Sequence, residues 1–416
     1  MLIYSIMSGR KTKQNRKKRK IEERDLKGFK YFKLLARLLE SLHDAGCQRD
    51  RAHNRILHMD QYMTLILMYM FNPVRDSLRA LQEASKLKKV QRVLKVPRSS
   101  LGSLSEAARV FDSELIIDII GQLAQQLGPV NHDARLNDFD QILTLVDGSW
   151  LRAVPKMTWA LFQDERHKSV KVHMHLELLK GVPVAATITD ANTAETKVLS
   201  QSLQAGRLYV LDRGYFNYQL YESVLDAASS FVCRARDNVV LREIIEERQL
   251  SDDALSTGVV RDVVAMIGHP KGKKNVTQPL RLVEIECTPH RKPSGKTGRG
   301  GPVQGDTILV VTDRLDLPPE VIGLIYQHRW QVEIFFRFFK HTLGCRHLLS
   351  HCENGIEMQV YAAIIACLII ALWTGRKPTL STYRMLCWHF TGWADDDEVM
   401  DHINKLKDQN AAAAVD

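Results

Sequence analysis

Features of membrane-spanning and secreted proteins are scarce in this sequence. The longest uninterrupted apolar run, Val360 to Trp373, has 14 residues, whereas a membrane-spanning helix needs about 20; we expect a buried helix instead. The apolar start, Met1 to Met7, precedes its basic residues, which is the wrong order for a secretory signal. The seven cysteines are an odd number without framework spacing, which excludes a disulfide-stapled fold and suits a reducing compartment.

The composition is that of an ordinary globular protein. Hydrophobic residues make up 45% and charged residues 25% of the 416, which excludes wholesale disorder and collagen-like structure. At about 150 residues for each domain, the length predicts two or three domains with sizeable cores.

Acidic residues are few at the beginning of the chain. The first 100 residues hold 24 Lys and Arg against 9 Asp and Glu, a net charge of +15, and the remainder carries −5. The densest run, Arg10 to Lys20, has eight basic and no acidic side chains. Because such a run cannot bury itself, we expect residues 1–28 to be a disordered basic arm. The arm is either a solvated tail or a sequence-independent contact with a phosphate backbone.

Helical patterns follow the arm. Apolar residues recur at helical spacing over Leu34–Leu42 and Gln61–Phe71, Arg75–Lys95 indicates one or two helices, and a further helix is expected near Ser105. Residues 29–130 are therefore predicted to be a helical domain that binds duplex DNA; its basic face would also suit RNA or an acidic partner. The basic residues of that face are Arg75, Arg79, Lys86, Lys88, Lys89, Arg92 and Lys95.

After Pro129 the pattern changes to short strands that alternate with helices. The order strand, strand, strand, helix, strand, helix, strand is typical of a mixed α/β sheet with flanking helices. The predicted strands are Gln141–Val146, Val170–Leu178, Val182–Thr189, Arg207–Leu211 and Ser229–Arg236, and the predicted helices are Thr193–Leu203 and Phe216–Ala228.

A β-rich segment interrupts this pattern. Strand-like pieces at Val259–Val264 and Leu280–Glu286 precede a Gly, Lys, Arg and Pro stretch, Pro289–Gly305, that suits a mobile basic loop, and the strand Ile308–Val311 follows. The expected divisions are 138–237, the first part of the sheet domain; 238–306, a β-rich insertion; 307–390, the second part of the sheet domain; and 391–416, a C-terminal tail.

Two carboxylates stand at the carboxyl ends of predicted strands. Asp147 follows the first strand in the sequence DGS, and Asp212 follows the fourth in LDRGYF, 65 residues later. Ligands of open α/β sheets bind at this edge, because side chains there point into a crevice between loops. Asp-Gly is also a common turn sequence, so either aspartate alone could be a turn residue with no functional role.

A long apolar helix, predicted from Glu320 to Gly344, carries a polar stripe. Four residues at offsets 0, 3, 7 and 14 lie within an arc of about 60° along about 21 Å of an α-helix. The other faces are apolar and are expected to be core. The stripe is either a solvent face or the lining of a site, and its members are Tyr326, Arg329, Glu333 and Lys340.

These residues carry a resemblance to a known family. The spacing Y-x2-R-x3-E-x6-K resembles the signature of bacterial insertion-sequence transposases of the DDE class, the insertion-sequence-four type. The settings of Asp147 and Asp212, and a β-rich insertion before Glu333, are similar to the same family. The resemblance covers about residues 30 to 390 and implies an RNase H-like catalytic domain in which these three carboxylates are catalytic.

The resemblance also implies metal-dependent cutting and joining of DNA. Two divalent ions held by carboxylate oxygens neutralise the phosphate, activate the attacking oxygen and stabilise the leaving one. Asp147, Asp212 and Glu333 would hold two Mg²⁺ ions, for which Mn²⁺ can substitute. In the family, water cuts the end of the element, the freed 3′-hydroxyl forms a hairpin, and the reopened 3′ ends join target DNA.

The implied partners are double-stranded DNA, as terminal inverted repeats and as target, and a second copy of the chain, since two ends must be paired. Residues 29–130 would bind the DNA ends. No membrane partner is expected, and the implied location is the bacterial cytoplasm, at the nucleoid. The residues implied to contact DNA are Tyr326, Arg329, Lys340, Trp330 and Arg213.

Alternatives to this function stay open. Trp330 would stack on a base displaced in the hairpin, but no tryptophan occurs between Trp159 and Trp330, so the insertion lacks the tryptophan that holds such a base in some relatives. The chain is alternatively an inactive copy that only binds DNA, or an RNase H-like nuclease that cuts without joining.

Two further polar groups are interpreted as structural. Asp190 and Glu195 are expected to cap the helix that starts near Thr193. The other group has no standard zinc spacing and is expected to pack; it consists of Cys345, His347, His351 and Cys352.

Overall fold

The fold was analysed in a computed structural model of the chain. The predicted basic arm, 1–28, and almost all of the stretch Pro289–Gly305 lie outside the residues that the structure describes. These are residues 35–50, 54–72, 77–130, 134–136, 139–152, 157, 159–162, 164–268, 276–287, 305–345 and 347–413.

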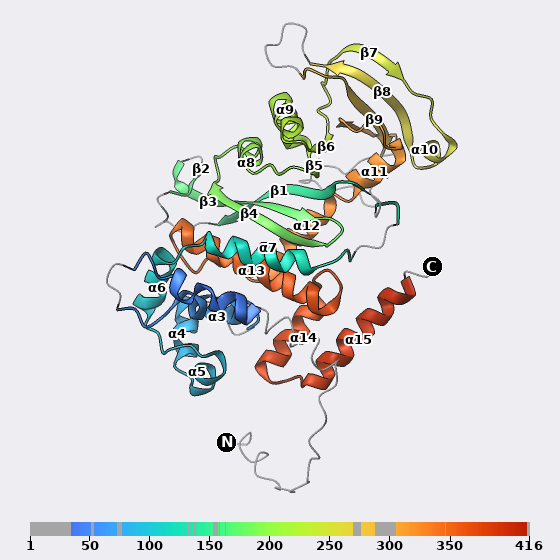
Figure 1. Ribbon diagram of the computed structural model, residues 1–416. Coiled ribbons are helices and arrows are strands. Elements are labelled where there is room, and N and C mark those ends of the chain that lie inside the picture. Colours follow the sequence, from blue (N-terminus) through green and yellow to red (C-terminus); the bar gives the residue numbers. More distant parts are fainter. Residues whose placement is uncertain are drawn as a thin grey trace, which may run out of the picture.

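Five strands form the central part of a mixed sheet (Figure 1). Their spatial order is β4-β3-β1-β5-β6, and β3 is antiparallel to both of its neighbours while β1, β5 and β6 are parallel. This is the RNase H-like arrangement, so the predicted fold class is confirmed. The strands are β1 (Ile142–Arg152), β3 (Asp164–Glu177), β4 (Val182–Asp190), β5 (Arg207–Leu211) and β6 (Ser230–Arg234), and the short β2 (Leu161–Phe162) pairs with the start of β3.

The β-rich insertion continues this sheet. Strand β10 (Thr307–Thr312) pairs antiparallel with β6 on one side and with β9 on the other, and β9, β8 and β7 follow in antiparallel order. The whole sheet therefore has ten strands. The insertion consists of β7 (Leu241–Glu247), α10 (Asp252–Ser256), β8 (Val259–Ile267) and β9 (Leu280–Glu286).

A buried ion pair joins two strands of the insertion, β8 and β9. The guanidinium of Arg281 on β9 donates to both carboxylate oxygens of Asp262 on β8, at 2.9 and 2.7 Å, and both side chains are only 2% exposed. The same guanidinium donates to the backbone carbonyls of Arg314 and Leu317. The loop after β10 is thereby tied to the insertion.

Helices cover both faces of the sheet (Figure 1). On one face lie α8 (Glu195–Gln201) and α9 (Tyr218–Asp226), and on the other lie α7 (Leu115–Gln126) and α13 (Glu353–Thr374). Helix α13 is apolar on all sides and packs against β4, α3, α6, α7 and α15. It is long and apolar enough to cross a membrane, but 94% of its most apolar window is buried inside the protein. The prediction of a buried helix at Val360–Trp373 is confirmed.

The N-terminal helices share the core of the sheet domain. Residues of these helices and of α13 belong to one continuous apolar cluster that extends to the sheet. Ser77 and Ser100 cap α4 and α6 by accepting the N–H groups of Ala80 and Ser103. The helices are α2 (Leu42–Ala45), α3 (Met59–Met70), α4 (Leu78–Ser85), α5 (Lys88–Leu94) and α6 (Leu101–Val110), and a 3₁₀ turn, η1 (Ala134–Leu136), leads to β1.

The single helix predicted over Glu320–Gly344 is wrong in detail. Near Arg329 three backbone N–H groups donate to carbonyls only three residues earlier, so the helix tightens and divides; the pairs are Arg329 to Tyr326, Gln331 to His328 and Val332 to Arg329. The segments are α11 (Pro319–Gln327), α12 (Trp330–Arg337) and a π-helical turn, η3 (Phe338–Thr342).

The C-terminal residues add two helices to the core. Helix α14 (Leu380–Thr391) precedes α15 (Asp396–Ala413), which contains most of the predicted tail. Val399 and Ile403 of α15 are buried, and α15 packs against α13 and α14.

Candidate active site

The first aspartate lies within β1, beyond the end of that strand's parallel pairing. The pairing of β1 with β5 ends at Leu145 and Val210, whereas β1 continues beside β3 past Asp147. The Asp147 carboxylate accepts the backbone N–H of Gly148 at 2.8 Å.

The second aspartate follows the neighbouring parallel strand. Asp212 comes directly after β5 and caps a 3₁₀ turn, η2 (Arg213–Tyr215), by accepting the N–H of Gly214 at 2.8 Å. Carboxyl ends of adjacent parallel strands meet at one edge of a sheet. The negative charge of Asp212 accordingly helps to raise the pKa of Asp147.

The Asp147 carboxyl group holds its proton near neutral pH. Burial, together with the negative charges of Asp212 and Glu195, raises its pKa to about 7, while the Gly148 N–H and the positive charge of Arg329 oppose the increase. A buried carboxyl group with a strongly raised pKa is a candidate functional residue.

The third carboxylate, Glu333, stands in the first turn of α12. The Arg329 guanidinium donates to Glu333 Oε1 at 2.6 Å and also lowers the pKa of Asp147. Helix α12 packs against β1, the strand that carries Asp147. Arg329 therefore lies within electrostatic reach of carboxylates from the helix and from the sheet.

The rest of the polar stripe faces the same two aspartates. Burial raises the pKa of Tyr326, Arg329 lowers it, and the negative charge of Asp212 raises it. Burial lowers the pKa of Lys340, and the charge of Asp147 opposes this. The stripe thus lines the carboxylate edge although its helix is divided.

The other residues expected at DNA lie at the rim. Trp330 is 53% exposed beside Arg329. Arg213 donates to Asp237 at 3.1 Å, and this pair is exposed to solvent. Sequence reasoning missed Trp150, which is 56% exposed three residues after Asp147 on the same strand; its exposure is visible only in the fold.

The carboxylates fit divalent cations by their chemistry. Asp147, Asp212 and Glu333 supply hard oxygen ligands of the kind that Mg²⁺ and Mn²⁺ prefer. In the described part of the chain they do not form a closed cage, since the ligand atoms found within 4.8 Å of one another are those of His43, Asp44 and His58. Glu333 is held by Arg329 instead.

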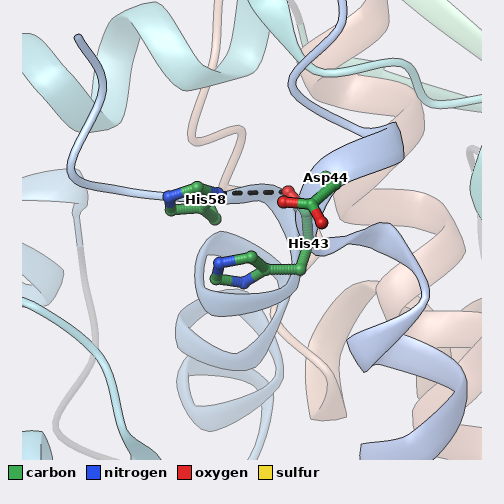
Figure 2. Close-up of side chains that lie close together, drawn as sticks. All are labelled: His43, Asp44 and His58. Carbon is green, nitrogen blue, oxygen red and sulfur yellow. Dashed lines mark hydrogen bonds between the residues drawn. The ribbon is translucent and has the colours of Figure 1, made fainter. Parts of the chain in front are cut away.

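That second group of residues lies between α2, which contains His43 and Asp44, and the start of α3, where His58 is the N-cap (Figure 2). The imidazoles of His43 and His58 stack at 3.8 Å with an angle of 6° between their planes. Lone pairs of parallel rings run parallel, so they do not converge on one ion as tetrahedral coordination requires. The His43 Nδ1 is 2.9 Å from Asp60 Oδ1, and the His58 Nδ1 is 3.1 Å from the His43 carbonyl. We assign the group a structural role beside the helix cap.

One of the two structural interpretations is partly wrong. Asp190 does order the turn before α8, by accepting the N–H groups of Asn192 and Thr193. Glu195 does not cap α8, because the N-cap position is Ala194 and has no side-chain hydrogen bond. Glu195 reaches Lys171 on β3, with Oε1 3.3 Å from Nζ.

The cysteine and histidine group before α13 makes ordinary packing contacts. The Cys352 thiol donates to the Ala108 carbonyl at 3.2 Å, and Cys345 is buried. All seven cysteines are free of disulfides.

An RNase H-like sheet with one acidic side chain within β1 and another directly after the adjacent parallel strand β5 defines a class of proteins that act on nucleic acids. Within that class, the chain belongs to the transposase DDE domain family, whose model matches residues 138–369.

Several transposases are similar to the chain. It is 26% identical over 226 residues to a putative transposase of Sinorhizobium fredii, covering 54% of this chain and 59% of that protein. It is 26% identical over 278 residues to a probable transposase for insertion sequence element IS5377 of Geobacillus stearothermophilus, covering 66% and 67%. A putative insertion-sequence transposase of a Synechocystis species is 22% identical over 278 residues, covering 65% and 71%.

Among solved structures, a piggyBac transposase synaptic complex with hairpin DNA matches with a TM-score of 0.40 and 11% identity, covering 92% of this chain and 85% of that one. This similarity is too remote to extend to function.

Proposed function

We propose that the chain is a DNA transposase that binds the terminal inverted repeats of its insertion sequence, cuts them and joins the 3′ ends to target DNA. The observation that supports the proposal is that Arg329, which donates to Glu333, also lowers the pKa of Asp147, while the neighbouring Asp212 raises it. The match of the transposase DDE domain over residues 138–369 supports it.

Asp147, Asp212 and Glu333 would hold two divalent cations, Mg²⁺ or Mn²⁺. When bound, the cations neutralise the scissile phosphate and activate the attacking oxygen. The raised pKa of Asp147, about 7, means that binding a cation there displaces a proton. Glu333 must exchange its ion pair with Arg329 for this role, which frees the guanidinium for the DNA.

Arg329 and Lys340 would bind phosphates beside the cut. The planar guanidinium matches two phosphate oxygens, and the ammonium acts as a point charge. Tyr326 has a hydroxyl that can donate to the same backbone. Arg213, paired with an exposed Asp237, would contact DNA further from the cut.

A hairpin intermediate is part of the proposal. Trp330, 53% exposed beside Arg329, would stack on the base that the hairpin displaces. Two copies of the chain would pair the two ends, and the helical residues 29–130 would bind them. The site of action would be the nucleoid of a bacterial cytoplasm.

Incubation of the protein with Mg²⁺ and DNA that carries the inverted repeats flanking its gene tests this function. Cleavage followed by strand joining supports a transposase. Binding without cleavage would identify an inactive DNA-binding derivative, and cutting without joining would identify a nuclease. The hairpin is detected as a product that runs at twice the single-strand length on a denaturing gel.

The carboxylates are tested by substitution. We expect Asp147→Ala, Asp212→Ala and Glu333→Ala each to abolish cleavage while binding of the ends stays within about threefold, since the charge that contacts DNA is elsewhere. Gel-shift titration measures binding. Cleavage by any of the three variants would refute the assignment of that residue.

A further inference from the structure

An apolar groove lies among the N-terminal helices and α13. Helices α3, α4 and α5 are on the same side of α13 (Figure 1). The groove has a volume of about 570 Å³, which is within the range of about 300–1,000 Å³ that is typical of binding sites. It is lined from α3 by Leu67 and Phe71, from α5 by Val90 and Leu94, and from α13 by Ile369. These side chains offer an apolar partner a large contact surface.

The α5 part of the groove is incompletely covered. Helix α5 packs against α4, but Val90 and Leu94 are only half-buried. Leu87, which precedes α5 and also lines the groove, is 57% exposed. Apolar side chains that stay accessible around a concave surface mark a place where another segment binds.

The first described residues form part of the groove wall. Leu35 and Leu39 line the groove and are 8% and 5% exposed. The 34 residues before Leu35 lie outside the described part of the chain. Any segment among them is joined covalently to the groove, so it would bind at a local concentration on the order of 1 mM. Even a weak contact would then be well populated.

One uncharged apolar segment occurs in this part of the sequence. Six of the seven residues of Met1–Met7 (MLIYSIM) are apolar. The 27 residues from Ser8 to Leu34 separate the segment from Leu35 and span up to about 90 Å when extended, so the segment can reach the groove. The other cluster of apolar residues, Phe29–Leu34, contains two lysines. Met1–Met7 is therefore the better match to an apolar groove.

The charges at the groove also suit this segment. Glu40 and Asp60 are among the polar residues that line it, with Lys95 as a single basic residue. The basic run Arg10–Lys20 follows Met1–Met7 after only two residues. A net negative charge beside the groove favours the approach of a segment that brings basic residues with it.

We propose that Met1–Met7 docks in the groove formed by α3, α5 and α13 of the same chain. The inference goes beyond the proposed function, because neither DNA nor a cation takes part in the contact. Docking would tie the basic run Arg10–Lys20 to the body of the protein at both ends. The run would then lie beside the exposed Lys88, Lys89 and Arg92 of α5, and the two basic surfaces would form one.

The test is photocrosslinking of the full-length protein without DNA. Tyr4 is replaced by p-benzoylphenylalanine, and mass spectrometry identifies the peptides that are joined to it. We expect crosslinks within one molecule to α3, α5 or α13. Val90→Asp places a charge in the groove wall and should reduce their yield at least tenfold. Val260→Asp, at a 47% exposed position of β8, is the matched control and should leave the yield unchanged.

A second variant keeps the test decisive if Val90→Asp does not fold, which circular dichroism would reveal. Ile3→Asp with Ile6→Asp changes no residue of the groove and should reduce the yield as strongly. Crosslinks elsewhere, or a yield that this variant leaves unchanged, would overturn the inference. Crosslinked dimers on a denaturing gel would show that the segment binds another molecule, and would overturn docking within one chain. A probe at Phe32 that reaches the groove where the probe at Tyr4 does not would assign the groove to Phe29–Leu34, and would also overturn the inference.

Discussion

At the scale of single residues, the ionised form of Asp147 lowers the free energy of unfolding, because its carboxylate is buried. Its pKa, raised to about 7 by burial, means that the folded protein holds the proton more tightly than the unfolded chain. The contribution of Asp147 to stability is therefore present at acid pH and is lost as the pH rises through about 7. Such a cost is common at residues that serve function at the expense of stability.

Replacement of Asp147 by Asn should make the metal-free protein more stable at pH 8. Asn has nearly the same shape and no charge to bury, so we expect a gain of about 2–4 kcal/mol at pH 8 that shrinks as the pH falls to 5. Urea unfolding in the presence of a chelator measures it. Asp237→Asn, at an exposed position, should change stability by less than about 0.5 kcal/mol. A gain that is the same at both pH values would contradict this account.

Two buried histidines should make the protein sensitive to acid. Burial lowers the pKa of His173 and of His175 to about 4, so the unfolded chain takes up protons at these residues first as the pH falls below about 6.5. Stability is complete above that pH and decreases between about 6.5 and 4. We expect His175→Gln to flatten the loss over this window in pH-dependent urea unfolding. An unchanged slope would show that other groups control acid unfolding.

Residues at the site differ in how far sequence could predict them. Asp212 is visible as an acid at a strand end, and Glu333 is visible through its spacing from Arg329. The prediction that Asp147 follows a strand ending at Val146 is wrong, because β1 continues beside β3 to Arg152. The ion pair of Glu195 with Lys171 is not visible in the sequence, because it joins residues of two different elements, α8 and β3. The first helical turn suggested a cap, which is the common local use of such a residue.

At the scale of elements, periodicity predicted regular strands well and irregular helices poorly. The strands Arg207–Leu211 and Leu280–Glu286 are found with the predicted bounds. Each is a short apolar run between turn residues, and such a run is too short to be a helix. The helix predicted near Ser105 begins at Leu101, because Ser100 is the cap. The division of the 320–344 helix depends on individual backbone hydrogen bonds near Arg329, and side-chain periodicity does not record these.

The buried ion pair of the insertion should be costly to break on one side. Arg281→Met leaves Asp262 charged and buried without a partner, so we expect a loss of about 3–5 kcal/mol in urea unfolding. Replacing both residues, Arg281→Met with Asp262→Leu, should cost less than the single change, because no charge is then stranded. Arg261→Met breaks an exposed pair with Glu247 and should cost less than about 1 kcal/mol. Equal losses for the buried and the exposed pair would contradict the argument.

At the scale of the whole molecule, the sheet and the N-terminal helices form one body. Sequence composition suggested separate regions, because the basic charge is concentrated in the first 100 residues. The apolar run at Val360–Trp373 did not predict which elements pack against it, because a helix that is apolar on all sides has no single face that must be buried. In the structure that helix is covered by elements from both ends of the chain.

A fragment limited to residues 138–369 should therefore not fold stably. It lacks α3, α6, α7 and α15, which cover α13, and so it would expose a large apolar surface. We expect aggregation or a broad, non-cooperative melt by circular dichroism, whereas residues 35–413 should melt cooperatively. A soluble fragment with a sharp transition would contradict a shared core.

The central position of α13 also constrains how the molecule can change over generations. This 22-residue helix packs against the sheet, the first helices and the last helix. The packing surfaces of all these elements must therefore fit the same set of side chains. In a hybrid that joins the first 130 residues of one relative to the remainder of another, the N-terminal helices would pack poorly along the whole of α13. New preferences of the opening helices should then arise by point replacements on their outer faces, and not by exchange of entire segments between lineages.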